Sequence, residues 1–171
     1  MEKYVPNAAQ AALHAIRGQN RVHTFVGGRG AGATTALLMD PVANGFTAGE
    51  GYGLYVCRNY SQSVRAFNFL RESAPGNVPL VEQMRLKWLP RGFNSVYQWR
   101  SDELIRAILG MRFDHIAIDD VDDMSEEDFV GILMCLRGEN ERMVVSCSPH
   151  VLIGDTWQNR RLANRVIAQE G

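Results

Sequence analysis

Two short stretches of this sequence carry residues whose type and spacing suit the binding of phosphate and of a metal ion. The first is "GGRGAGATT", in which Gly27, Gly32 and Thr34 follow the pattern G-x-x-x-x-G-x-[ST]. Glycines at this spacing let backbone N–H groups turn towards phosphate oxygens, and the Thr34 hydroxyl is placed to bind Mg²⁺, with Thr35 as the next candidate. A tight turn also needs glycines, but the strand pattern before this stretch and the helix pattern after it favour a phosphate loop. The predicted nucleotide-binding residues of the loop are Gly27, Gly28, Arg29, Gly30, Ala31, Gly32, Ala33, Thr34 and Thr35.

The loop departs from the usual pattern at Ala33, where a lysine normally bridges the β- and γ-phosphates. Loss of one preorganised charge of this kind costs on the order of 10²–10³ in rate. Arg29 lies inside the loop and is a candidate catalytic residue, although its planar guanidinium is not interchangeable with an ammonium. Three explanations of Ala33 stay open: an engineered Lys-to-Ala substitution, a natural loss of activity, and compensation by Arg29.

The second stretch is "HIAIDDVDDM", in which an apolar run leads into acidic residues. Asp119 has the position of a carboxylate that holds Mg²⁺ through water, and Asp120 that of a general base for the attacking water. Most ATPases of this type have Glu at the second position, and the shorter Asp orients water only if the backbone or an extra water makes up the reach. The alternative is that Asp120, Asp122 and Asp123 form a solvated turn before a helix.

Short apolar runs alternate with helical patterns along the rest of the chain, and these elements must position the two stretches. The alternation predicts an α/β fold with a mainly parallel central sheet and helices on both faces. Together with the phosphate loop it indicates a P-loop NTPase of the additional-strand, RecA-like type. Strands are expected at 21–28, 51–58, 94–99, 113–120 and 142–148, and helices at 7–18, 34–40 with Pro41 as the end, 61–72 and 125–138, with a helix or loop at 102–110.

Length, charge and hydropathy limit the class of protein. With 171 residues and 46% apolar content, we expect residues 1–171 to form a single P-loop ATPase-like domain without a nuclease domain. The 18 Lys and Arg nearly balance the 19 Asp and Glu, so no net field draws the molecule to nucleic acid or to a membrane. No apolar run reaches the roughly 18 residues of a membrane span, and the start "MEKYVPNAAQ" lacks a signal-peptide core, so we expect a soluble intracellular protein.

The cysteines and histidines are scattered. Cys57, Cys135 and Cys147 lie far apart inside apolar stretches, which indicates reduced core thiols rather than disulfides or a zinc site. The histidines do not cluster along the sequence either, and we assign them no chemistry. They are His14, His23, His115 and His150.

Several of these motifs together resemble the ATPase domain of the large terminase subunit of tailed bacteriophages, over most of the chain. "GGRGAG" is similar to that family's arginine-containing phosphate loop, and "PNAAQ" resembles its upstream glutamine motif, in which Gln10 would contact adenine. "YVCRNYSQSVR" is similar to its second strand, and "IRAILGMRFDHIAIDDVDDMSEEDF" to its acidic strand and flanking segments. "MVVSCSPH" resembles its coupling strand, in which Ser146, Cys147 and Ser148 would sense hydrolysis.

The resemblance implies a DNA-packaging motor that uses ATP and Mg²⁺ to move double-stranded DNA into a procapsid. It further implies a homo-oligomeric ring at the portal, a small terminase subunit as partner, and the host cytoplasm as location. The chain departs from the family at Ala33, at Asp120 in place of Glu, and at Ser148 in place of Asn. One alternative is a non-hydrolysing descendant that binds nucleotide or assembles with packaging or capsid partners. A weaker one is another small P-loop enzyme, such as a nucleotide kinase.

Arginine-rich segments offer a second layer of function. A trans-acting arginine can complete a neighbouring subunit's site, although each candidate also suits an ordinary surface charge. The segment 85–100 mixes basic and aromatic residues, which is typical of a nucleic-acid contact or of core aromatics beside exposed arginines. Arg161 and Arg165 have helical spacing that fits a solvated face or a DNA contact. The candidate trans-acting residues are Arg58, Arg106, Arg112 and Arg137.

Overall fold

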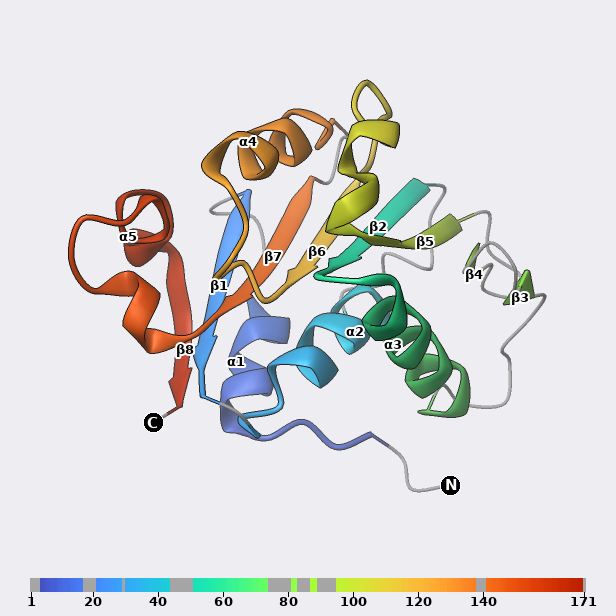
Figure 1. The fold of residues 1–171 in the computed structure, drawn as a ribbon. Helices are drawn as coiled ribbons and strands as arrows, with labels where there is room; N and C mark the ends of the chain where they lie inside the picture. Colours follow the sequence, from blue (N-terminus) through green and yellow to red (C-terminus); the bar gives the residue numbers. More distant parts are fainter. Residues whose placement is uncertain are drawn as a thin grey trace.

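The structure is a computed structural model that describes residues 4–16, 21–28, 30–43, 51–73, 81–82, 87–88, 95–137 and 141–170. Its strands are β1 Val22–Gly27, β2 Gly51–Cys57, β3 Val81–Glu82, β4 Lys87–Trp88, β5 Ser95–Ser101, β6 His115–Asp119, β7 Arg142–Cys147 and β8 Val166–Glu170. They form one sheet in the order β3-β4-β5-β2-β6-β7-β1-β8 (Figure 1). From β5 to β8 every neighbouring pair is parallel, and the short strands β3 and β4 pair antiparallel. The predicted mainly parallel sheet is therefore confirmed.

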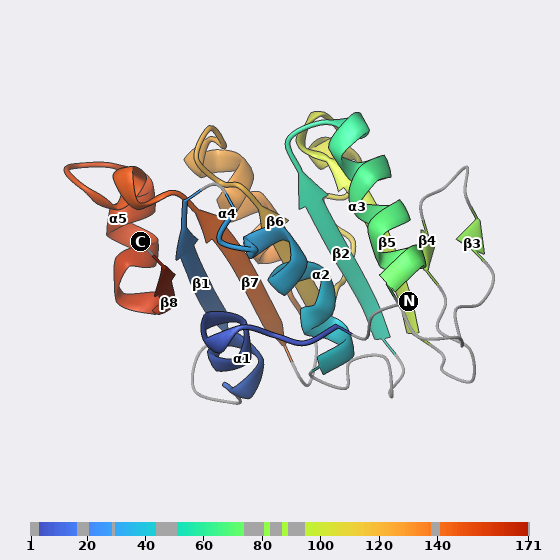
Figure 2. The same ribbon diagram turned by 90° about the horizontal axis from the view of Figure 1, so that it is seen from below.

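Helices cover both faces of this sheet, as predicted. The helices are α1 Ala8–Ala15, α2 Ala33–Ala43, α3 Tyr60–Ser73, η3 Asp102–Ala107, α4 Glu126–Met134, η4 Pro149–Leu152, α5 Trp157–Leu162 and η5 Ala163–Arg165. Seen from below, α1, α2 and α3 lie in front of the strands and α4 lies behind them (Figure 2). Among the residues that the structure describes, no helix is long and apolar enough to cross a membrane.

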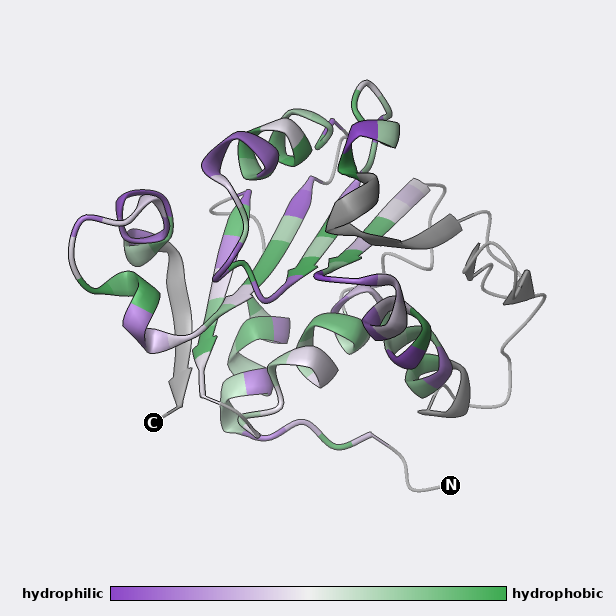
Figure 3. Cartoon of the chain, in the orientation of Figure 1, coloured by the Kyte–Doolittle hydropathy of each residue, from purple (hydrophilic) through white to green (hydrophobic). Residues whose placement is uncertain are grey.

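The core has one layer on each side of the sheet because successive side chains of a strand point to opposite faces. In β6, Ile116 and Ile118 belong to the apolar cluster that includes Phe129 of α4. The intervening Ala117 belongs to the opposite cluster, with Leu37 of α2. The central strands are mainly hydrophobic, whereas the segment after β6 is hydrophilic (Figure 3). Cys57, Cys135 and Cys147 are all buried, which confirms the prediction of core thiols.

The order of strands sets which loops meet. Strand β7 lies between β1, which leads into the glycine-rich loop, and β6, which ends at Asp119. This inserted strand is the additional strand of the predicted fold type. Because the carboxyl ends of parallel strands lie at the same edge, the segments after β1, β6 and β7 come together there.

Most predicted elements are present, and three of the predicted helix ends are wrong. Helix α1 ends at Ala15 instead of continuing to residue 18, because the backbone of Ile16 is extended. Helix α2 continues through Pro41 to Ala43 instead of ending at the proline. Pro41 lies in the last turn, where its missing N–H removes a single helical bond, and its ring is buried. Helix α4 ends at Met134, earlier than expected, because Leu136 forms a parallel bridge with Phe113.

Candidate nucleotide-binding site

The two stretches singled out in the sequence lie together at the carboxyl edge of the sheet. The glycine-rich loop, the end of β6 and the end of β7 line one cavity of about 400 Å³. The lining residues are Gly27, Gly28, Gly30, Gly32, Ala33, Thr34, Asp119, Asp120, Ser146, Cys147 and Ser148.

The glycines let the loop fold tightly between β1 and α2. Gly32 has a φ of +80°, and a Cβ at this position would lie 2.5 Å from Nε2 of Gln10. A Cβ on Gly27 would lie 2.7 Å from Cβ of Ala31. The carbonyl of Gly32 accepts the backbone N–H of Ala36 at 2.9 Å and so starts the hydrogen bonding of α2. The loop therefore leads directly into a helix whose positive end adjoins the cavity.

Ala33 is the first residue of α2 and lines the cavity. It is partly buried and packs against the apolar cluster between the sheet and helices α1 to α3. Its methyl group supplies no charge to a phosphate. Arg29, the candidate for compensation, lies outside the described residues, and its role stays a prediction.

Asp119 is the centre of the polar contacts in the cavity. Its Oδ2 accepts hydrogen bonds from Thr34 Oγ1 at 2.7 Å and from Tyr55 Oη at 2.8 Å, and its Oδ1 accepts one from Ser146 Oγ at 2.8 Å. Thr34 and Asp119, predicted as metal ligands, are thus in direct contact. Tyr55, in β2, is a partner that the sequence interpretation missed, because nothing near residue 55 indicates a contact with residue 119.

The oxygens around Thr34 and Asp119 fit Mg²⁺, which takes hard oxygen ligands. Mg²⁺ in nucleotide sites keeps several waters and needs only one or two protein ligands besides phosphates. A hydroxyl and a carboxylate beside a cavity of this size meet that requirement. Thr35 is the following residue of the same helix turn.

Asp120 has an unusual backbone conformation, with a φ of +68° that residues other than glycine rarely adopt. Its N–H donates to Ser146 Oγ at 2.8 Å, and its Oδ1 accepts the N–H of Asp122 at 3.3 Å. Burial, followed by the charge of Asp122, raises the pKa of Asp120. A carboxylate with a raised pKa is a better proton acceptor than an ordinary one.

The other acidic residues of "DDVDD" have structural partners. Asp122 Oδ1 accepts the N–H of Ser148 at 2.9 Å, and Asp123 forms an ion pair with Arg58 at 2.6 Å. The solvated-turn alternative thus describes part of this segment, whereas Asp119 and Asp120 line the cavity.

The three expected coupling residues are all at this edge. Ser146 connects Asp119 with the backbone of Asp120, and Ser148 contacts Asp122 through its N–H. Cys147 is buried between them, and burial, followed by the charges of Asp122 and Asp120, raises its pKa to about 12. Its thiol therefore stays neutral at physiological pH.

Gln10 lies against the back of the glycine-rich loop. Its Nε2 donates to the carbonyl of Gly32 at 3.0 Å, and its Oε1 accepts the N–H of Asn7 at 2.9 Å. Asn7 and Gln10 also form a capping box at the start of α1. Gln10 therefore contacts the backbone of the glycine-rich loop, and the spacing of residues in "PNAAQ" does not predict this contact.

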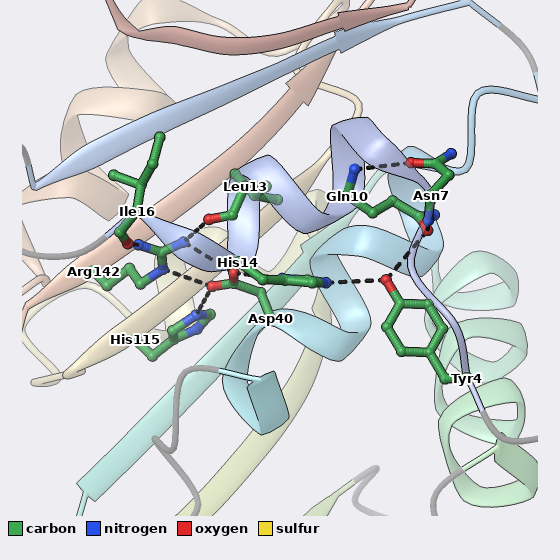
Figure 4. A network of polar contacts seen from close by, with 9 residues as sticks. All are labelled: Tyr4, Asn7, Gln10, Leu13, His14, Ile16, Asp40, His115 and Arg142. Atoms are coloured by element: carbon green, nitrogen blue, oxygen red, sulfur yellow. Dashed lines mark hydrogen bonds and ion pairs between the residues drawn. The ribbon is translucent and has the colours of Figure 1, made fainter.

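A buried polar network lies at the opposite, amino edge of β6 and β7 (Figure 4). Asp40 of α2 accepts hydrogen bonds from His14 at 3.1 Å, from His115 at 2.9 Å and from Arg142 Nε at 2.7 Å. Two of the four histidines, His14 and His115, thus meet at one carboxylate although they lie far apart in the sequence, because helix and sheet packing brings them together. An aspartate within the apolar helix pattern of α2 was the signal that could have indicated a buried partner.

Some of the candidate trans-acting arginines and basic residues have contacts within the chain, and others are exposed or lie outside the described residues. Arg112 lies 4.0 Å from Asp114, Arg137 Nε donates to the carbonyl of Met134, and Arg106 is exposed. Arg161 Nε donates to Glu126 at 2.6 Å, which supports the surface interpretation of that residue. The side chains of segment 85–100 and of Arg165 lie outside the described residues. None of these contacts tests a role in trans or on DNA.

Fold and site together define the class of this chain. P-loop NTPases of the additional-strand type have a glycine-rich loop between β1 and α2 and an acidic strand separated from β1 by one strand. This chain has both, and the Thr34 hydroxyl after the loop donates a hydrogen bond to Asp119 at the end of the acidic strand. No protein-family model and no curated protein sequence matches the chain.

Solved structures do match, over most of the chain. The large terminase ATPase domain of Thermus phage P74-26 has 17% identity and a TM-score of 0.72, covering 88% of this chain and 71% of that one. The large terminase of a thermophilic bacteriophage, in complex with ATP-γ-S, has 11% identity and a TM-score of 0.65, covering 95% of this chain and 43% of that one. The N-terminal domain of the DNA packaging ATPase from bacteriophage phi29 has 16% identity and a TM-score of 0.56, covering 77% of each. The chain therefore has the fold of phage packaging ATPase domains.

Proposed function

We propose that this chain is the ATPase domain of a viral DNA-packaging motor, which binds ATP with Mg²⁺ and couples hydrolysis to the movement of double-stranded DNA into a procapsid. The observation that carries the proposal is the 2.7 Å hydrogen bond between Thr34 and Asp119. It joins the phosphate loop to the acidic strand, the two halves that nucleotide chemistry needs in one place.

Each side chain of the site has a role in this proposal. The backbone of the loop and the start of α2 would bind the phosphates, and Thr34 and Asp119 would hold Mg²⁺, which would supply positive charge to neutralise the phosphates. Asp120 accepts the proton of the attacking water, with its raised pKa and its backbone held by Ser146. Ser146 contacts both aspartates and so can transmit a change at the phosphates to β7.

Ala33 limits this chemistry. A methyl group at the lysine position leaves the phosphate charge less neutralised, at a cost on the order of 10²–10³ in rate. The packing of Ala33 against apolar residues favours a second candidate, a nucleotide-binding or assembly protein that does not hydrolyse ATP. In both cases we propose the host cytoplasm as the location, and the portal, the small terminase subunit and further copies of the chain as partners.

The experiment that separates the two candidates measures ATP binding and ATP turnover by the chain and by Ala33→Lys, the turnover with and without double-stranded DNA. The motor proposal predicts DNA-stimulated turnover that rises by about 10² or more in Ala33→Lys. Binding of ATP without turnover in either protein supports the assembly candidate. Absence of ATP binding in both proteins contradicts the nucleotide site itself.

A further inference from the structure

Gln10 occupies the narrow space between α1 and the glycine-rich loop. Its side chain is 6% exposed, and its Nε2 donates to the carbonyl of Gly32 at 3.0 Å. The loop approaches so closely that a Cβ on Gly32 would lie 2.5 Å from this nitrogen. The amide group of Gln10 is therefore in direct contact with the backbone that would surround the phosphates.

The other end of the amide is also in use. Gln10 Oε1 accepts the N–H of Asn7 at 2.9 Å and lies 3.3 Å from the hydroxyl of Tyr4, which points at it. A side chain that recognises a base needs its donor and acceptor groups for that base. Turning Gln10 away would leave the N–H of Asn7 without this acceptor and would remove the donor from Gly32, so two hydrogen bonds of the folded chain would be lost.

The helix that carries Gln10 is anchored at its far end (Figure 4). Burial, followed by the charge of Asp40, raises the pKa of Tyr4 to about 12, so its hydroxyl stays protonated beside Gln10 and lies 3.0 Å from His14 Nε2. His14 donates to Asp40 of α2, and Arg142 of β7 donates to the carbonyl of Leu13 at 2.8 Å. These hydrogen bonds hold helix α1 against α2 and the sheet. The position of Gln10 relative to the glycine-rich loop is fixed as a result.

We propose that Gln10 is a positioning residue that holds the phosphate loop through Gly32, and that it supports the triphosphate of a nucleotide and not its base. This inference rests on the proposed function, because it takes the loop as the phosphate site. Its consequence is that the contribution of Gln10 to affinity is the same for every ligand that has a triphosphate.

The test compares three ligands, each with excess Mg²⁺: ATP, GTP and inorganic tripolyphosphate. Isothermal titration calorimetry of the full chain and of Gln10→Ala is expected to show affinities about fivefold weaker in the variant, by the same factor for all three ligands. A loss confined to ATP would show that Gln10 contacts adenine and would overturn the proposal. Unchanged affinity for all three ligands would overturn it as well.

A matched control separates the amide contact from the stability of α1. Ala12 is exposed in the middle of α1, and Ala12→Gly destabilises the helix without changing the groups around Gln10. It is expected to lower the unfolding temperature and to leave the three affinities unchanged. If Ala12→Gly weakens binding as much as Gln10→Ala, helix stability is responsible and the proposal fails. If the unaltered chain binds none of the three ligands, the proposed nucleotide site fails first, and this inference falls with it.

Discussion

The sharpest prediction about the stability of the fold concerns the buried carboxylate of Asp40. Asp40 is fully buried and accepts two hydrogen bonds from the guanidinium of Arg142, at 2.7 and 3.0 Å, besides those from His14 and His115. Burial alone would raise the pKa of Asp40, but the hydrogen bonds from His115, His14 and Arg142 outweigh burial and hold it well below its usual range. The charged form is therefore the one that the fold requires.

Asp40→Asn keeps the volume of the side chain and removes its charge. Arg142, which is 8% exposed, then keeps a buried positive charge without the carboxylate that neutralised it. Breaking a buried ion pair in this way costs about 3–5 kcal/mol of unfolding free energy. The matched control is Asp155→Asn, which removes an ion pair with Arg160 at a site where Asp155 is 91% exposed, and which should change the unfolding free energy little because water screens both charges.

Urea denaturation followed by circular dichroism measures both variants at pH 7 and at lower pH. Because the folded-state pKa of Asp40 is lowered, its contribution is fully present above the ordinary value of 3.8 and is lost as the pH falls through the folded-state pKa. The part of the difference between the unaltered chain and Asp40→Asn that comes from ionisation of Asp40 should thus be present at pH 7 and be lost only below about pH 4. A loss in Asp40→Asn no larger than that in Asp155→Asn would refute the reasoning.

Two further predictions concern a histidine and a glycine. Burial, followed by Arg142, lowers the pKa of His23 to about 4, so its neutral form stabilises the fold fully above its ordinary value of 6.5, and this contribution is lost as the pH falls towards 4. His23→Gln should flatten the stability curve in that window by up to about 1.4 kcal/mol per pH unit in urea titrations, and an unchanged slope would contradict this. Gly32→Ala should lower the unfolding free energy by about 1–3 kcal/mol because of its positive φ and its contact with Gln10. Gly28→Ala, whose added Cβ would have no neighbour within 4 Å, is the control and should change the unfolding free energy by less than about 0.5 kcal/mol.

The layout of the sheet and of the site could be predicted because both depend on local patterns. The alternation of apolar runs with helix patterns follows from the packing of parallel strands under helices on both faces. The spacing of Gly27, Gly32 and Thr34, together with Asp119 at the end of an apolar run, was enough to locate the cavity, because parallel strands end at one edge.

What could not be predicted depends on contacts between distant residues. Asp40 and Arg142 are separated by 102 positions and meet only when α2 packs against β7. Tyr55 reaches Asp119 across neighbouring strands, and a lone tyrosine in an apolar strand resembles any core aromatic. Gln10 was assigned to adenine by resemblance, whereas its contact with Gly32 depends on where α1 lies in three dimensions.

The central claim is that the glycine-rich loop and Asp119 bind a nucleotide together with Mg²⁺. The most direct test is the affinity for ATP of the unaltered chain and of Asp119→Asn, measured by calorimetry in excess Mg²⁺ and in EDTA. We predict that Mg²⁺ strengthens ATP binding to the unaltered chain, and that Asp119→Asn still binds ATP in EDTA but gains nothing from Mg²⁺. The same gain in both proteins, or no ATP binding by the unaltered chain, would contradict the account.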